Sequence, residues 1–207
     1  MNEARGDRGR RVRLSEEERR EQIRKAAFEV ASRDGISGLT VRAVAAEAKV
    51  SHALVLFHFG RKGGLVRELL EWLITDSAVL HISDDVARFP HARDRLHALL
   101  EQEMARLSNR PRRTRLFLEY WALGARHGDI RDRISAELER YREAFRAIME
   151  ELISAEPVTY ASATADGMAA VAVSWIHGCA VQALVDPGHF QTDQYLAAVR
   201  TMIRGMG

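Results

Sequence analysis

Side chains that could bind a nucleic acid are concentrated between residues 40 and 62 of this 207-residue chain. Thr40 and Ser51 each precede a short segment with helical apolar spacing. Each is therefore predicted to cap a helix, where hydroxyl and backbone N–H groups can bind phosphates. Arg42 and Lys62 add positive charge beside them. Together these groups indicate contacts with a phosphate backbone.

The segment after Ser51 also offers side chains that could contact base edges. The candidates are His52, Ala53, Leu54 and Phe57. Ala53 or Leu54 suits a thymine methyl group, because apolar side chains pack against it in the major groove. Each residue alone could equally belong to a solvated helix face, so the interpretation rests on the set and its spacing.

Two short helices separated by a tight turn must position these groups over residues 38–62. Their apolar positions are Val41, Val44, Ala45 and Ala48 in the first helix, and Leu54, Val55 and Phe59 in the second. The outward positions of the second helix are His52, Ala53, Phe57 and His58. This pattern predicts a helix-turn-helix, which is too small to bury its own core and needs a scaffold.

Residues 18–66 resemble the DNA-binding domain of the TetR family of transcriptional repressors. The matching residues are Ile23, Ala26, Ala27, Gly35, Gly38, Leu39, Thr40, Val44, Ala45, Val50, Ser51, His58, Phe59, Lys62 and Leu65. The resemblance implies an all-α repressor, and it implies that His58 contacts the DNA backbone. Residues 115–126 and 175–187 resemble the BetI-like branch of that family.

Three positions depart from the family pattern. Leu56 replaces a tyrosine that donates its hydroxyl to phosphate, so that contact is lost or moved. Lys49 replaces the turn glycine, which costs about 1 kcal/mol if the turn is left-handed but adds a charge near DNA. Leu54 replaces a common threonine and leaves the operator sequence open.

A second set of residues suggests a ligand site in the C-terminal part. Asp76 and Glu103 are acids centred on the apolar faces of predicted helices, where burial requires a partner. One interpretation is an internal salt bridge, for example to Arg106 or Arg126. The other is a cavity for a cationic ligand, which acids and aromatic rings would bind together. The aromatic candidates are Trp72, Phe117, Tyr120, Trp121 and Trp175.

The sequence gives little support for a metal site, a cofactor or an enzyme. His177 and Cys179 are two residues apart, so on a helix they point to different sides, and we interpret both as core residues. The chain contains no nucleophile elbow and no phosphate-binding glycine loop. We therefore predict no catalytic residues and no cofactor.

Charge and composition separate the two ends of the chain. Residues 1–62 hold 14 Lys and Arg against 9 Asp and Glu, whereas residues 63–207 hold 17 against 20. A basic end on an acidic body is typical of a nucleic-acid-binding domain joined to another domain. The single cysteine and the absence of an apolar leader predict a cytoplasmic protein.

The low proline content and helix-forming composition predict an all-α chain. We expect an Arg-rich arm over residues 1–14, which either reaches DNA or is a solvated tail, and a DNA-binding domain over residues 15–62. Its first helix should start after Ser15 and end at Asp34, before a left-handed Gly35. Residues 63–207 should form an effector-binding and dimerisation domain, with a connecting helix over 63–80 and a loop over 81–91.

Residues 167–185 are apolar nearly all round, which is typical of a buried helix or a membrane span. Polar residues inside the segment favour burial, and we predict that the last two helices pair with their copies in a two-fold dimer. The whole pattern predicts a ligand-responsive repressor that binds a palindromic operator. The alternatives are a constitutive DNA-binding protein and a helical enzyme with a vestigial head.

Overall fold

A computed structural model describes residues 15–75 and 84–205, and every regular element in these ranges is an α-helix, as the sequence predicted. The expected arm (1–14), Asp76 and the end of the predicted connecting helix lie outside the described residues. Backbone contacts divide the chain into a unit that ends at Leu69 and a unit that begins at Leu70. These are called the head and the body below.

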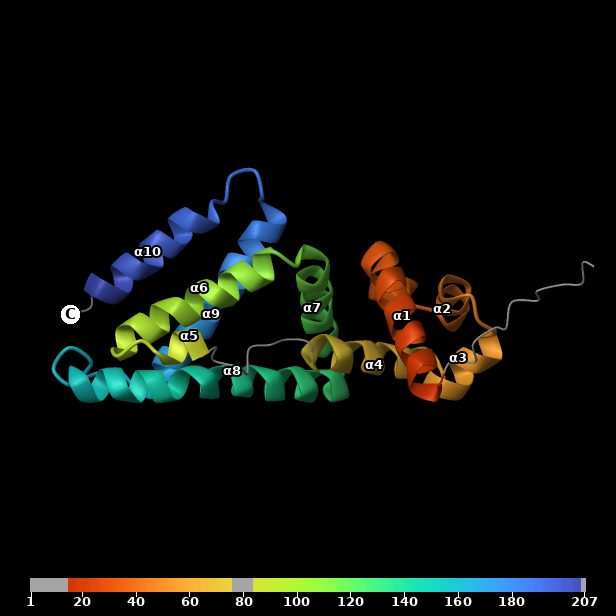
Figure 1. The fold of residues 1–207 in the computed structure, drawn as a ribbon, viewed down its shortest axis with the longest axis horizontal. Coiled ribbons are helices and arrows are strands. Elements are labelled where there is room, and N and C mark those ends of the chain that lie inside the picture. Colours follow the sequence, from red (N-terminus) through yellow and green to blue (C-terminus); the bar gives the residue numbers. More distant parts are fainter. Residues whose placement is uncertain (1–14, 76–83, 206–207) are drawn as a thin grey trace, which may run out of the picture. The chain divides into compact units, whose positions relative to one another are not determined.

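The head contains α1 (Glu16–Gly38), α2 (Val41–Ala48), α3 (His52–Phe59) and the start of α4 (Lys62–Thr75) (Figure 1). The predicted caps are confirmed. Ser15 and Glu18 form a reciprocal capping box, and the Thr40 and Ser51 hydroxyls accept bonds from Ala43 N and Leu54 N. Side-chain acceptors thus satisfy N–H groups that the first turn of a helix leaves without backbone partners.

The end of α1 differs from the prediction. Helical hydrogen bonding resumes after Asp34 and continues to Gly38, so the predicted end is four residues too early. Gly35 does adopt positive φ, as predicted, but with φ 73° and ψ 173° it makes a kink inside the helix. A side chain is disfavoured in this backbone region, which explains why the kink falls at glycine.

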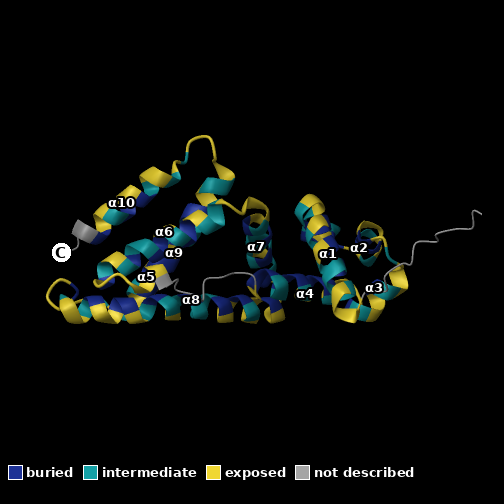
Figure 2. Ribbon diagram, viewed as in Figure 1, coloured by how far each residue is buried: buried dark blue, intermediate teal, exposed yellow. Residues whose placement is uncertain are grey.

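Apolar side chains from three helices form the core of the head. They are Ile23, Ala27 and Val30 of α1, Val44 and Ala48 of α2, and Val55 and Phe59 of α3, all buried. The Arg20 guanidinium lies over the Phe59 ring at 5.4 Å and pairs with Glu68 at 2.8 Å. The core therefore fixes the inward side of α3 and leaves its other side exposed (Figure 2).

The body adds α5 (Asp84–Ala87), α6 (Ala92–Ser108), α7 (Pro111–Gly124), α8 (Gly128–Ala155), α9 (Ala165–Val185) and α10 (Thr192–Gly205). The short α5 lies within residues 81–91, which the sequence predicted to be a loop. Its single turn is too short to show helical periodicity in the sequence.

The apolar helix predicted over residues 167–185 is the central helix of the body. Among the described helices, α9 is long and apolar enough to cross a membrane. However, it packs against both α8 and α6, and its inward residues are Ala169, Ala172, Val173, Ile176, Cys179 and Ala180. These contacts identify α9 as a core helix.

Candidate DNA-binding surface and effector cavity

The exposed side of α3 carries the residues predicted to contact bases. His52 and Ala53 are exposed, and Phe57 keeps 77% of its surface. Leu54, which the sequence assigned both to the inward side and to base contact, is half-buried. Leu56 is 38% exposed and presents an alkyl side chain there. The surface is thus more apolar than a typical phosphate-binding face.

The groups expected to bind phosphate differ in how available they are. Thr40, Arg42 and Ser51 are exposed, and His58 is half-buried beside the Phe57 ring, 5.1 Å between centroids. The Lys62 ammonium donates to the Ser37 carbonyl oxygen at 2.5 Å. Lys62 is therefore part of a contact that ties the start of α4 to the end of α1.

The residue that joins α2 to α3 has a left-handed backbone conformation, which glycine adopts more readily than other residues. Lys49 has φ 54° and ψ 43°, and among the described residues it alone has positive φ without being glycine. Its N–H bonds to Ala46 O at 3.2 Å, and the next residue bonds back to Ala45 O. The exposed lysine side chain lies between the two helices of the predicted DNA-binding motif.

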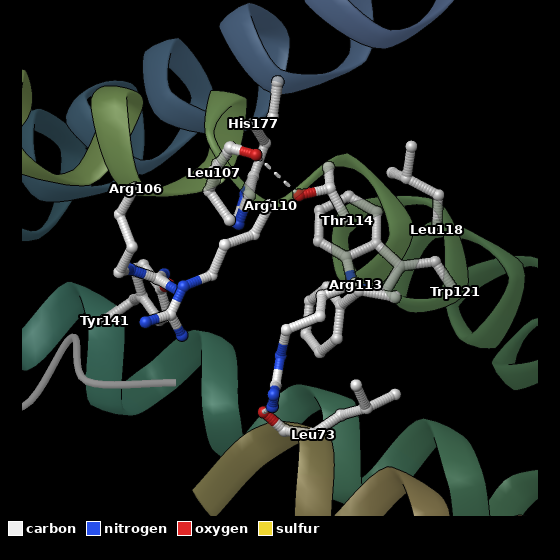
Figure 3. A pocket seen from close by; sticks show the side chains of 12 residues that line it. Leu73, Arg106, Leu107, Arg110, Arg113, Thr114, Leu118, Trp121, Tyr141 and His177 are labelled. Carbon is white, nitrogen blue, oxygen red and sulfur yellow. Dashed lines mark hydrogen bonds between the residues drawn. The ribbon is translucent and has the colours of Figure 1, made fainter. Parts of the chain in front are cut away.

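A cavity of about 40 Å³ lies in the body, with seven of its twelve lining residues between Leu107 and Trp121 (Figure 3). We call it the α7 cavity. Its lining residues are Leu73, Arg106, Leu107, Arg110, Arg113, Thr114, Phe117, Leu118, Trp121, Tyr141, His177 and Ala180. Thr114 Oγ1 donates to the Leu107 carbonyl oxygen at 2.9 Å, so its hydroxyl hydrogen is already used.

The structure separates the predicted ligand-binding residues. Phe117 and Trp121 line the α7 cavity, whereas Trp72 lies beside it under the Arg113 guanidinium, at 4.5 Å. Tyr120 is fully buried and lies outside the cavity lining, because its position on α7 turns it into the packed core. Burial also raises its hydroxyl pKa.

Glu103 follows the salt-bridge interpretation. It is fully buried, and Arg106 donates to its Oε2 through Nε at 3.0 Å and Nη2 at 2.8 Å. Arg106 also donates to the Tyr141 hydroxyl at 2.7 Å. Glu103 is absent from the cavity lining, so the expected acid-and-aromatic lining does not include it.

A second cavity of about 440 Å³ lies elsewhere in the body and is mostly apolar. It contains Trp175, the last of the predicted aromatic residues, with Met149, Leu152, Met168 and Ile203. Trp175 and Trp121 therefore do not share one site. The sequence could not show this, because both lie on helices with several apolar sides.

Sequence analysis missed five residues of the α7 cavity that carry its polar character. They are Arg106, Arg110, Arg113, Tyr141 and His177. Arg106 was considered only as a salt-bridge partner, and His177 only as a core residue. His177 packs edge-on against Trp121, 4.6 Å between centroids, while Cys179 is fully buried as predicted. No group of three or more potential metal ligands occurs among the residues that the structure describes.

Burial lowers the pKa of His177 to about 4, and the positive charge of Arg106 contributes to the shift. The imidazole is therefore neutral at pH 7, and one ring nitrogen can donate while the other accepts. Burial opposes the charge of Arg106, yet its interactions with Tyr141 and Glu103 outweigh that effect and raise its pKa. Arg106 thus stays charged at the cavity wall.

A helix-turn-helix head with an exposed second helix, joined to a helical body with cavities, defines a DNA-binding transcriptional regulator. Residues 23–69 match the family described as bacterial regulatory proteins of the tetR family, and residues 92–207 match the BetI-type transcriptional repressor C-terminal family. The chain belongs to the TetR family and has a BetI-type body, as the sequence resemblance indicated.

Similar proteins support the same class. The chain is 26% identical over 191 residues to the nicotine-responsive transcriptional repressor HdnoR of Paenarthrobacter nicotinovorans, covering 85% of this chain and 89% of that protein. A transcriptional regulator from Rhodococcus has a TM-score of 0.73 at 22% identity, with 90% and 95% coverage. A regulator from Saccharomonospora viridis in complex with choline has a TM-score of 0.74 at 19% identity, with 91% and 96% coverage.

Proposed function

We propose that this protein represses transcription by binding a palindromic operator as a dimer, and that a small-molecule effector bound in the body releases it. The observation that carries the proposal is the exposed, N-capped α3 within a segment that matches the tetR family. A helix of this kind enters the major groove with its N-terminal residues foremost.

The proposed contacts follow from exposure and position. Ser51, Thr40 and Arg42 bind phosphates, and the N-terminal part of α3 reads bases through His52, Ala53 and Leu54. Phe57 supplies a large apolar contact beside His58. The Lys62 ammonium already donates to Ser37 O, so a phosphate would have to share this group or replace that bond. Its affinity contribution should therefore be small.

A gel shift with DNA from the chain's own upstream region tests the proposal. We expect specific retardation that weakens with salt, because phosphate contacts release counterions. Ser51→Asp keeps an N-cap acceptor but places a negative charge beside phosphate, so folding should be retained and binding lost. The control is Lys25→Glu, which reverses an exposed charge on α1 outside the proposed contacts. Binding that is equally strong in Ser51→Asp would contradict the assigned contact.

The proposed dimer uses the last two helices. Valines on α9 remain exposed in the single chain, with Val171 at 48%, Val181 at 37% and Val185 at 74%, as does Met202 of α10 at 56%. Exposed apolar side chains along one side of a helix favour an interface. Two-fold pairing would present two α3 helices, which must lie about 34–36 Å apart, or a multiple of this, to read successive turns of DNA.

The two body cavities favour a ligand-responsive regulator over a constitutive DNA-binding protein. HdnoR is nicotine-responsive and the Saccharomonospora regulator binds choline, which supports a small organic effector for this chain. We place the effector in the α7 cavity, because it includes Leu73 of α4, the helix that crosses from head to body. A bound effector would then shift α4 and favour a separation of the two α3 helices that does not fit DNA. A regulator of this kind acts in the cytoplasm.

A further inference from the structure

We propose that the second cavity of the body binds a small, uncharged and largely apolar organic molecule, with Tyr160 as its hydrogen-bonding partner. This inference goes beyond the proposed function, because it assigns a ligand site other than the α7 cavity. Among the described residues, the two cavities share no lining residue. They are therefore separate sites.

The second cavity is large enough to admit a ligand as it stands. Its volume is about 440 Å³, whereas benzene fits an engineered cavity of roughly 150 Å³. Small-molecule sites in proteins measure roughly 300–1,000 Å³. The space therefore suits a molecule with two fused rings or a chain of similar bulk.

The walls of the cavity come from four helices of the body. Leu96 of α6, Met149 and Leu152 of α8 and Ile203 of α10 are buried lining residues, and Trp175 of α9 is half-buried. An apolar ligand enclosed by these side chains would lose most of its contact with water. Removal of apolar surface from water favours binding.

Contacts between these helices fix the positions of the walls. The Tyr195 hydroxyl of α10 donates to the Trp175 carbonyl oxygen of α9 at 3.0 Å, and Arg200 of α10 donates to Glu101 of α6 at 2.5 Å. α8 packs directly on α9. The cavity is thus largely preformed, as most small-molecule sites are.

The described lining contains no Asp, Glu, Lys, Arg or His. A charged ligand would lose its hydration in this cavity without gaining a counter-charge, which is unfavourable. Its polar side chains are the hydroxyls of Tyr160, Ser162 and Thr164, which donate and accept hydrogen bonds without carrying charge. The lining therefore favours an uncharged ligand.

Tyr160 supplies a polar group that has no partner. The residue is 5% exposed and lines the cavity, and its hydroxyl makes no hydrogen bond to the rest of the described chain. A buried hydroxyl without a partner is unfavourable. A ligand with one hydroxyl or carbonyl group would pair with it.

Two methionines suit a ring-containing ligand. Met149 and Met168 line the cavity together with Trp175. Thioether side chains adapt their shape and pack favourably against aromatic rings. Trp175 offers a further aromatic surface for stacking or edge contact. We therefore expect a fused-ring probe to bind.

The cavity opens to solvent where α8 is joined to α9. Ser162, Thr164 and Gly167 are exposed lining residues at this connection, so a ligand can enter without displacing a core side chain. Val171 is also an exposed lining residue and belongs to the proposed dimer surface. Variants that test the cavity should therefore leave Val171 unchanged.

Three matched probes, titrated into the full chain by calorimetry at pH 7 and constant ionic strength, test the ligand class. They are 1-naphthol, 1-naphthoate and 1-naphthylmethylammonium, which share two fused rings and differ in charge. We expect 1-naphthol to bind at least about tenfold more tightly than either charged probe, because the described lining offers no counter-charge. A smaller preference, or no 1-naphthol binding up to about 1 mM, overturns the proposal. Absent binding would instead favour a second copy of the chain as the occupant.

Filling the cavity tests the location of the site. Ala163 is a half-buried lining residue, whereas Ala161 is exposed and lies outside the lining. Ala163→Phe should occupy the space and weaken 1-naphthol binding at least about tenfold, and Ala161→Phe is the control that should bind it normally. Circular dichroism shows whether both variants fold. Equal affinities of the two folded variants overturn the assignment of this cavity.

Tyr160→Phe keeps the ring and removes only the hydroxyl, so it tests the site even if Ala163→Phe does not fold. We expect 1-naphthol to bind about three- to tenfold more weakly, because one hydrogen bond between uncharged groups is lost. Unchanged affinity would overturn Tyr160 as the partner of the ligand.

The gel shift without any probe separates this inference from the proposed function. Operator binding together with absent 1-naphthol binding overturns the second ligand site and leaves the DNA-binding regulator standing. Binding of 1-naphthol that is lost in Ala163→Phe, without any DNA binding, supports the ligand site and removes the proposed function.

Discussion

Lys49 holds a backbone conformation that glycine adopts at lower cost. At φ 54° and ψ 43° its Cβ approaches the following carbonyl, a conformation costing ~1–2 kcal/mol for L-residues. Lys49→Gly removes that strain but makes the unfolded chain more flexible, which costs ~0.5–1 kcal/mol. We expect Lys49→Gly to be about 0.5–1 kcal/mol more stable than Lys49→Ala, as measured by urea unfolding.

The alanine variant is the matched reference, because both substitutions remove the same exposed charge. Any effect of that charge on stability or DNA affinity therefore cancels between them, and the difference reports the backbone. Equal stability of the two variants would show that the turn relaxes when the lysine is removed.

His177 should make the folded state sensitive to acid. Its pKa is about 4 in the fold, below its ordinary value of 6.5, because burial and Arg106 oppose the imidazolium. Between these values the unfolded chain binds more protons, so stability is complete above pH 6.5 and falls toward pH 4, by at most about 3 kcal/mol. We expect His177→Gln to flatten this part of the stability profile.

Thermal unfolding midpoints at several pH values measure the effect. Glu137 contributes with the opposite sign, because burial raises its pKa, but it is present in both proteins. The difference between wild type and His177→Gln therefore isolates the histidine. Parallel profiles for the two proteins would show that His177 is solvated in the native ensemble.

Two adjacent glycines at the start of α4 have opposite structural roles. A Cβ on Gly64 would lie 1.8 Å from the Phe59 carbonyl oxygen, whereas one on Gly63 would meet nothing within 4 Å. Gly64 thus allows α3 and α4 to follow each other closely. The Phe59 carbonyl group belongs to the backbone of α3, so it cannot make room for a Cβ on Gly64 unless α3 moves.

We expect Gly64→Ala to destabilise the head by about 2–3 kcal/mol or more, through overpacking. Gly63→Ala should instead be neutral or stabilise by up to ~1 kcal/mol, because alanine favours a helix. Urea unfolding of both variants, with a gel shift for DNA affinity, measures the difference. Similar stabilities would contradict the close approach at Gly64.

Local patterns were enough to predict most elements of this fold. The three caps Ser15, Thr40 and Ser51 are fixed by hydrogen bonds within four residues, so their sequence signature is complete. On α8, buried residues such as Ile130, Ile134, Phe145 and Leu152 recur at helical spacing, a pattern that is visible in the sequence itself. The continuation of α1 after Gly35 and the single turn of α5 were missed because each is too short to show helical periodicity in the sequence.

The α7 cavity was harder to predict, because it depends on which sides of the helices meet. Phe117 and Tyr120 are three residues apart on α7, yet one lines the cavity and the other is in the core. His177 and Trp121 are far apart in sequence and pack edge to edge. Helical periodicity identifies the apolar side of a helix but not the helix that packs against it. Arg106 was therefore considered only as a salt-bridge partner and His177 only as a core residue.

At the scale of the whole molecule, DNA affinity and dimerisation should be lost together. Val171, Val181 and Val185 fall within an arc of about 80° on α9 at 100° per residue, so they form one exposed side. A two-fold axis across this side would place each valine near its copy. Introducing acids there would bring like charges together in an apolar contact, while the single chain keeps its core.

We therefore expect Val185→Glu and Val171→Glu to convert the protein from a dimer to a monomer of 23.3 kDa, measured by light scattering after gel filtration. Val158→Glu is the control, because Val158 is 91% exposed and lies outside α9. Operator affinity should fall at least ~100-fold in the monomers, because the second head no longer binds as part of the same molecule. Monomeric wild type, or dimeric variants with unchanged affinity, would place the interface on another surface.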